Sequence, residues 1–369
     1  MPKVICEIVG GIVLGPTFLG HFFPEIHNWI FNGFESEGKL LSVIYWFGLV
    51  FLMFISGFEV QKFIDREDRK TIFALLLGST VIPFVAGWFA PNFYDFSPYL
   101  EEKGNSAAFN ILVAIAVAIT SIPVISKIFI DLGIINTRFA KIVLSTAMIQ
   151  DVILWLTLAI ATGMVSSEVV SIYSILLMVL VPVSFFGVAL WIMPGLIRMG
   201  NDLKINFIIK SSVSGYALFI CFIFGTMTSI LNINIVFGAF LAGIIIGTMP
   251  NKQFGNGKSH IKEFSLAFFI PLYFAIVGLK LDLINHFDLM FCLGFLLFSG
   301  FFETLGTMLA TRLIKKDWRT SLDFGAAINT RGVPGIVVAT VAFDMGIINE
   351  TFFAVLVMIA IVTSLIAGC

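Results

Sequence analysis

The chain of 369 residues is 59% hydrophobic and only 12% charged, and its mean hydropathy is +1.02. Soluble domains are about half apolar and about a quarter charged, so the composition indicates a bundle of membrane helices and excludes most soluble enzymes and secreted scaffolds. The net charge of −1 argues against a nucleic-acid partner, which requires a basic surface. The four cysteines show neither metal-site spacing nor a disulfide pattern, and we expect no cofactor and no resident metal.

Twelve segments of the chain are apolar enough to cross a bilayer, which takes about 20 residues of helix. We therefore predict an all-α polytopic membrane protein with about twelve transmembrane helices. The connections between them are too short to hold a separate soluble domain. The predicted spans are residues 4–23, 40–60, 71–91, 107–129, 141–163, 169–196, 205–227, 234–250, 264–281, 287–311, 321–343 and 350–368.

Basic residues are concentrated in alternate connections between these spans. One set of connections holds 18 Lys and Arg residues, the other holds 3, and Arg331 lies within a span. By the positive-inside rule the first set is cytoplasmic, and an even number of spans then places the C-terminus in the cytoplasm as well. We expect a multi-pass protein of the plasma membrane, with the bacterial inner membrane as the favoured location.

A short motif occurs twice in the chain. Residues 131–136 read DLGIIN and residues 344–349 read DMGIIN, and each follows a span that contains a proline, Pro123 or Pro334. The charge pattern places the first copy in a cytoplasmic connection and the second in an external one. Copies on opposite sides of the membrane indicate an inverted-topology repeat, which is typical of secondary transporters.

Two of the predicted spans are interrupted at corresponding places in this repeat. The first contains Thr120-Ser121-Ile122-Pro123, and the second contains the polar and glycine-rich stretch from Asn329 to Gly335. Proline lacks a backbone donor and breaks a helix, and the freed carbonyl groups at membrane depth make sites for small ions. A packing kink is the better explanation of one such span, but two at matching positions favour an ion site.

Three ionisable residues lie deep within predicted spans, where a charge costs about 2.5–3.5 kcal/mol on insertion scales. They are Asp151, Glu303 and Arg331, and Asp151 lies roughly 15 Å into its span at 1.5 Å per residue. An aspartate can hold a proton or, when ionised, coordinate a monovalent cation with help from neutral oxygens. Competition of proton and cation for one carboxylate couples their exchange. The alternative is a structural ion pair between an acid and Arg331.

Segments along the whole chain resemble the monovalent cation:proton antiporter-2 family, that is, the membrane domain of a sodium or potassium/proton exchanger. The resemblance implies an inverted-repeat antiporter fold in which a mobile core domain with two crossing, discontinuous helices moves against a dimerisation domain. The segments are PKVICEIVGGIVLGPTFLG at the start, MFISGFEV (53–60), AIAVAITSIPVISKIF with DLGIINTR, the pair Gln150-Asp151, FGAFLAGIIIG (237–247), FFIPLYFAIVGLKLDL (268–283) and NTRGVPGIVVA (329–339).

The resemblance also implies a division of the chain into domains and a homodimeric assembly. Family members often have a further helix before the one that opens this chain and a cytoplasmic regulatory domain after the last helix, so we expect this chain to be truncated. The implied division is residues 1–60 and 205–281 for the dimerisation domain, 169–196 for a linker helix, and 71–163 and 287–369 for the two repeats of the core domain.

Matched residue by residue, the ion-binding aspartate of the family falls on Asp151. Gln150 occupies the preceding position, as in potassium-efflux relatives. The crossing-helix positions fall on Thr120, Ser121 and the stretch from Asn329 to Gly332. We therefore predict cation and proton binding by Asp151, Gln150, Thr120, Ser121 and Asn329, and charge balance at the crossing helices by Arg331 and Glu303.

One residue departs from the family pattern. Glu303 stands where many members have a lysine that pairs with the aspartate. We hypothesise that Glu303 pairs with Arg331 instead, which leaves Asp151 as the one exchanging carboxylate and makes transport electroneutral.

These features favour a secondary transporter that exchanges Na⁺ or K⁺ for H⁺ by alternating access. A gated monovalent cation channel and a transport-inactive membrane sensor of the same fold are the alternatives. An intramembrane enzyme is less well supported, because no span pairs a nucleophile with a base or a metal cluster. The residues do not select between Na⁺ and K⁺, since that selectivity depends on cavity geometry.

Overall fold

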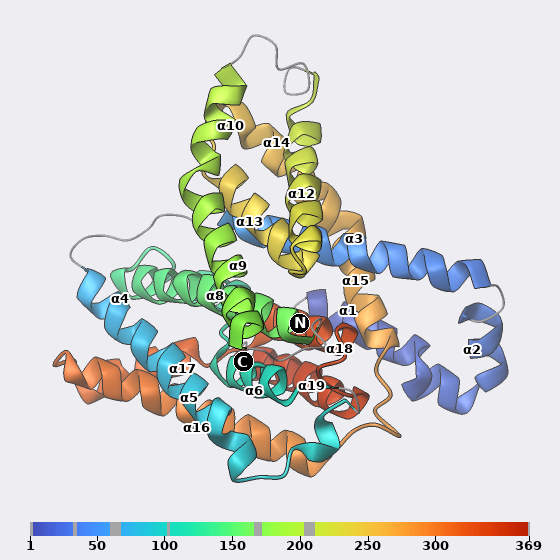
Figure 1. Cartoon of the computed structure of the whole chain (residues 1–369). Helices are drawn as coiled ribbons and strands as arrows, with labels where there is room; N and C mark the ends of the chain where they lie inside the picture. Colours follow the sequence, from blue (N-terminus) through green and yellow to red (C-terminus); the bar gives the residue numbers. More distant parts are fainter. Residues whose placement is uncertain are drawn as a thin grey trace. The chain divides into compact units, whose positions relative to one another are not determined.

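The computed structural model describes residues 3–31, 35–59, 68–101, 104–165, 172–202 and 211–367, which are helical apart from their connections (Figure 1). Within these ranges the one extended pairing is an isolated bridge between Leu100 and Ile348. The predicted all-α class is thus confirmed. Parts of four predicted spans and several of the counted basic residues lie outside the described ranges, namely residues 60, 169–171, 205–210 and 368, and Lys62, Arg66, Lys103, Lys204 and Lys210.

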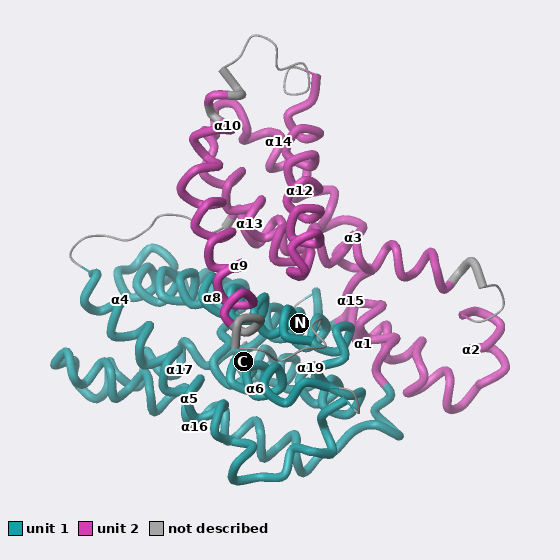
Figure 2. Tube along the Cα trace, in the orientation of Figure 1, with its two compact units in different colours: residues 1–5, 62–165, 282–369 teal, residues 6–61, 166–281 magenta. Residues whose placement is uncertain are grey.

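The chain divides into two compact units, shown in different colours in Figure 2. Unit 1 comprises Met1–Ile5, Lys62–Val165 and Asp282–Cys369, and unit 2 comprises Cys6–Gln61 and Ser166–Leu281. The predicted roles in transport and dimerisation stay predictions.

Unit 1 contains both interrupted spans and every predicted site residue. Its helices include one π-helical turn, η3, between α4 and α5. The elements are α4 (Arg69–Leu76), η3 (Leu77–Val81), α5 (Ile82–Phe89), η4 (Ala90–Asn92), η5 (Ser97–Tyr99), α6 (Ser106–Ala118), α7 (Ile122–Asp131), α8 (Arg138–Val165), α16 (Leu289–Leu313), α17 (Trp318–Ile328), α18 (Gly332–Asp344) and α19 (Glu350–Ala367).

Unit 2 contains helices that approach one another at glycines. A Cβ at Gly243 would overlap the Phe54 carbonyl, and one at Gly278 would overlap the Ile8 carbonyl. Small residues of this kind let membrane helices pack with their backbones in contact. The elements are most of α1 (Lys3–Leu14), η1 (Pro16–Gly20), α2 (Pro24–Phe31), α3 (Glu35–Glu59), α9 (Ile172–Trp191), α10 (Met193–Asp202), α12 (Val213–Ile230), α13 (Ile235–Gly247), α14 (Asn251–Phe264), η6 (Ser265–Phe269) and α15 (Ile270–Leu279).

Among the described residues, nine helical segments are long and apolar enough to span a membrane. A tenth candidate is the pair α17 and α18, which is bent by 47° at its break. Two shorter apolar helices, Leu176–Trp191 and Ile235–Gly247, fall within the remaining predicted spans. The polytopic class is confirmed, whereas the count of twelve is not, because α13 with 13 residues is shorter than a bilayer requires.

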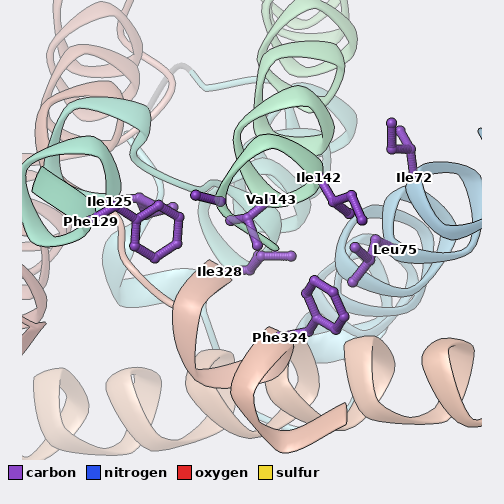
Figure 3. Close-up of a cluster of buried hydrophobic side chains, with 9 residues drawn as sticks. Ile72, Leu75, Ile125, Phe129, Ile142, Val143, Phe324 and Ile328 are labelled. Atoms are coloured by element: carbon purple, nitrogen blue, oxygen red, sulfur yellow. The ribbon is translucent and has the colours of Figure 1, made fainter. Parts of the chain in front are cut away.

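A cluster of buried apolar side chains holds four helices of unit 1 together beside the breaks (Figure 3). Ile328 is the last residue of α17, and Ile125 lies in the first turn of α7, so the cluster anchors the half-helices on both sides. In a membrane such side chains stabilise the arrangement by close packing between helices. The members are Ile72, Leu75, Ile125, Phe129, Ala140, Ile142, Val143, Phe324 and Ile328.

The two copies of the repeated motif end their helices in the same way. Gly133 and Gly346 have positive φ angles of 71° and 67°. In each copy the glycine N–H bonds to the carbonyl three residues earlier, at 2.9 and 3.0 Å. The next N–H bonds to the carbonyl five residues earlier, at 2.8 and 2.9 Å. This is the glycine-dependent helix ending that αL geometry allows; the inverted orientation of the copies stays a prediction.

The contact between η3 and α16 yields a first test. A Cβ at Gly306 on α16 would overlap the Gly78 carbonyl oxygen and meet the Ile82 Cβ at 2.9 Å. We expect Gly306→Ala to destabilise the protein by about 1–3 kcal/mol through overpacking, seen as a lower thermal unfolding midpoint in detergent. Gly294→Ala on the same helix is the control, because its Cβ meets no atom within 4 Å. Equal midpoints for the two variants would contradict this packing.

Candidate functional site

Both predicted interruptions are present as breaks of three residues. Helix α6 ends at Ala118 and α7 begins at Ile122, while α17 ends at Ile328 and α18 begins at Gly332. Pro123 and Pro334 lie in the first turns of α7 and α18, where a missing N–H costs little because first-turn donors have no intrahelical partner. The prolines therefore begin the second half-helix in each span.

The two breaks are in contact with each other. Gly332 has a φ angle of 46°, and a Cβ at this position would overlap the Ser121 hydroxyl. Only glycine combines this left-handed backbone with such a close approach. Residues Thr120 and Ser121 of the first break thus lie beside the start of α18.

Arg331 caps the end of α6 from the opposite break. Its Nε donates to the Ala116 carbonyl at 3.3 Å, and its Nη2 donates to the Val117 carbonyl at 3.4 Å. The last carbonyls of a helix have no intrahelical donor and carry a partial negative charge. A buried guanidinium donates hydrogen bonds to these carbonyls and also offsets their partial negative charge.

Glu303 on α16 balances this guanidinium. Arg331 Nη2 lies 3.2 Å from Glu303 Oε2, and the two side chains are 3% and 0% exposed. The Thr120 hydroxyl donates to Glu303 Oε1 at 2.9 Å, and Arg331 Nη1 donates to Asn329 Oδ1 at 3.2 Å. The hypothesised pairing is therefore present in the structure as an ion pair with no net charge.

Gln150 on α8 reaches the same end of α6. Its Nε2 donates to the Ala118 carbonyl and, at 3.1 Å, to the Ser79 carbonyl of η3. Three successive carbonyls, from Ala116 to Ala118, are therefore satisfied by two side chains from elsewhere in the chain.

Asp151 follows Gln150 and has no such partner. Asp151 as a whole is 9% exposed, and its Oδ1 is buried and makes no hydrogen bond. The Ser121 and Thr330 hydroxyls and the Gln150 Oε1 are likewise buried and unpartnered. Neutral oxygens and a carboxylate are the ligands that hard cations prefer, so the breaks and the adjoining turn of α8 hold suitable donors for a monovalent cation.

The structure brings most of the predicted site residues together at the breaks. Asp151 is the exception, because no hydrogen bond or ion pair links its carboxylate to another described residue. The roles predicted for these residues in ion binding and charge balance stay predictions. The set is Asp151, Gln150, Thr120, Ser121, Asn329, Arg331 and Glu303.

Sequence reasoning missed two features of this site. The first is the row of main-chain carbonyls at the end of α6, which depends on packing between distant helices. The second is η3, for which the signal was Gly78-Ser79-Thr80 followed by Pro83 within the predicted span 71–91. The same kind of polar and proline interruption revealed the other two breaks.

Comparison with known proteins identifies the family. The model described as "Sodium/hydrogen exchanger, transmembrane" matches residues 1–369. The chain belongs to this family. Its members are transporters, not enzymes, and the resemblance inferred from the sequence motifs is confirmed. The chain is accordingly a multi-pass membrane protein.

Several curated antiporters are similar to the chain over nearly all of its length. It is 28% identical to Cation/H(+) antiporter 15 of Arabidopsis thaliana and 27% identical to K(+)/H(+) antiporter 1 of Saccharomyces cerevisiae, covering 98% and 99% of this chain. It spans only 43% and 42% of those proteins. The Na(+)/H(+)-K(+) antiporter GerN of Bacillus cereus is 26% identical, with 99% of this chain and 88% of that protein covered.

A solved structure shows the same fold. The sodium proton antiporter MjNhaP1 of Methanocaldococcus jannaschii matches with a TM-score of 0.65 at 15% identity, over 100% of this chain and 91% of that one. The antiporter fold that the sequence predicted is therefore confirmed.

The cap on α6 predicts unequal effects of two substitutions. Arg331→Met leaves two helix-end carbonyls and the buried Glu303 without their donor, and we expect a loss of about 3–5 kcal/mol in the free energy of unfolding. Glu303→Gln removes the counter-charge of Arg331 but leaves its guanidinium on both carbonyls and keeps an acceptor beside it, and we expect a smaller loss because no carbonyl loses its donor. Thermal and denaturant unfolding in detergent compare them; equal losses would show that the carbonyl contacts of Arg331 contribute nothing.

Proposed function

We propose that the chain exchanges Na⁺ or K⁺ for H⁺ across the membrane, with Asp151 as the carboxylate that both ions share. The observation that carries this proposal is the unpartnered Asp151 beside the broken helices. Four charged residues are buried among the described residues, and the other three are paired: Glu303 with Arg331, and Asp68 with Arg138. The names of the relatives, which are cation/H⁺ antiporters, support the same activity.

The geometry provides a reason for obligatory exchange. A protonated Asp151 is neutral, and an ionised Asp151 with a bound monovalent cation is neutral as well. An ionised carboxylate with no bound ion is costly to bury. Only the proton-bound and cation-bound forms of the site therefore move readily between the two sides of the membrane. The proton and the cation therefore bind the same carboxylate alternately. The unpartnered oxygens of Gln150, Ser121 and Thr330 complete the cation site.

The ion pair of Glu303 and Arg331 determines the net charge that crosses the membrane in each transport cycle. Because the pair is fully buried and neutral, it adds no charge to either loaded form of the site. One proton then exchanges for one monovalent cation, and the cycle is electroneutral.

All of these residues belong to unit 1, so we propose that unit 1 carries the ion as a body in an alternating-access cycle. A homodimer in the plasma membrane with a cytoplasmic C-terminus is the setting that the family resemblance and the charge pattern favour.

Exchange in proteoliposomes tests the proposal. With a trapped pH dye and added Li⁺, Na⁺, K⁺ or Rb⁺, we expect saturable, cation-driven proton movement that Asp151→Asn abolishes, because an amide can neither release a proton nor neutralise a cation. Asp131→Asn is the matched control, since that carboxylate is exposed and pairs only with Lys127. Undiminished transport by Asp151→Asn would refute the mechanism, and a linear, unsaturable conductance would identify a channel.

Clamping the membrane potential tests the stoichiometry. We expect the same exchange rate at imposed potentials of either sign, because no net charge crosses in a cycle. A rate that follows the potential contradicts electroneutral exchange and would mean that a second charged group titrates during the cycle.

A further inference from the structure

The π-helical turn η3 interrupts the span that leads from α4 to α5. Such turns occur frequently at functional sites. Pro83 lies four residues after Ser79 and has no N–H, so it cannot make the α-helical hydrogen bond to the Ser79 carbonyl. That carbonyl instead accepts a hydrogen bond from Gln150 Nε2 at 3.1 Å.

A second freed carbonyl meets the same amide. Ala118 is the last residue of α6, and its carbonyl accepts from Gln150 Nε2 as well. A primary amide has two N–H donors on one nitrogen, which suits two carbonyl acceptors from two different spans. Ala118 ends its helix, and Ser79 has a proline at the position of its α-helical donor, so both carbonyls are free to accept from a side chain.

These two contacts decide which way the Gln150 amide faces. Only its NH₂ group can meet two carbonyl oxygens, so the network permits a single orientation of the amide. The Oε1 is left buried and without a hydrogen-bond donor, on the residue that precedes the unpartnered Asp151. Some buried hydroxyls are satisfied within their own helices: those of Thr146, Thr307 and Thr363 each bond to the carbonyl four residues earlier.

We propose that Pro83 and the Ser79 carbonyl form a positioning element for cation selectivity: they and Ala118 hold the Gln150 amide so that its oxygen is preset as a neutral cation ligand. This inference rests on the proposed exchange at Asp151. It assigns a function to η3, which lies outside the broken helices. The Ser79 and Thr80 hydroxyls of the same turn are also buried and unpartnered, so the turn presents further oxygen atoms in an otherwise apolar span.

Pro83→Ala tests the element without touching the site. The new N–H at position 83 competes with Gln150 for the Ser79 carbonyl. This competition weakens the hydrogen bond that holds the Gln150 side-chain amide in place. We expect the apparent KM for the preferred cation to rise about 2- to 10-fold, the range that corresponds to one hydrogen bond. The maximum rate is retained and the discrimination among Li⁺, Na⁺, K⁺ and Rb⁺ narrows. A purely structural defect lowers the active fraction, and hence the maximum rate, without moving KM or selectivity.

Pro91→Ala is the matched control. Pro91 lies at the end of the same span, and the carbonyl four residues before it, that of Gly87, already accepts from the Ala90 N–H. This substitution therefore disturbs no amide contact, and we expect the KM and selectivity of the parent.

Gln150→Glu is a second test that does not depend on Pro83. An ionised glutamate cannot donate to either carbonyl, so we expect a KM increase above 10-fold and a pH profile altered by a second carboxylate. Unchanged KM and selectivity in Pro83→Ala or in Gln150→Glu overturn the inference, as does a change in maximum rate alone. Parallel assays of Asp151→Asn separate the two proposals: transport by that variant refutes the exchange mechanism itself.

Discussion

The site depends on one constraint: the last carbonyls of α6 lie within an apolar span and have no hydrogen-bond donor in their own helix. Three successive carbonyls, from Ala116 to Ala118, need donors in a region without bulk water, where an unsatisfied group costs several kcal/mol. Arg331 supplies donors from the break before α18, and Gln150 supplies one from α8. Each further property of the site follows from this arrangement.

The guanidinium that caps α6 brings a positive charge, and Glu303 neutralises it. A lysine at position 303 would face Arg331 with a like charge. The acid at this position and Arg331, in the break before α18, are therefore one electrostatic unit. Because that unit is complete, Asp151 has no basic partner among the described residues, which is why we propose it as the carboxylate for proton and cation.

Much of this could be predicted from the sequence, because apolar length, proline placement and buried charge are local signals. Thr120-Ser121-Ile122-Pro123 and the stretch from Asn329 to Gly335 indicated both breaks. The partners of Gln150 could not be predicted, since they are main-chain carbonyls on helices that meet only after folding. The count of twelve spans was not confirmed, because α13 has only 13 residues and apolar composition alone does not set helix length.

The central claim is that one carboxylate serves both ions, and proton release on cation binding tests it most directly. Purified protein in weakly buffered detergent, with a pH indicator, is titrated with the transported cation while binding is measured in parallel. The account predicts about one proton released per cation bound, and no cation-induced release from Asp151→Asn. Cation binding to the parent without proton release, or the same release from the variant, would contradict it.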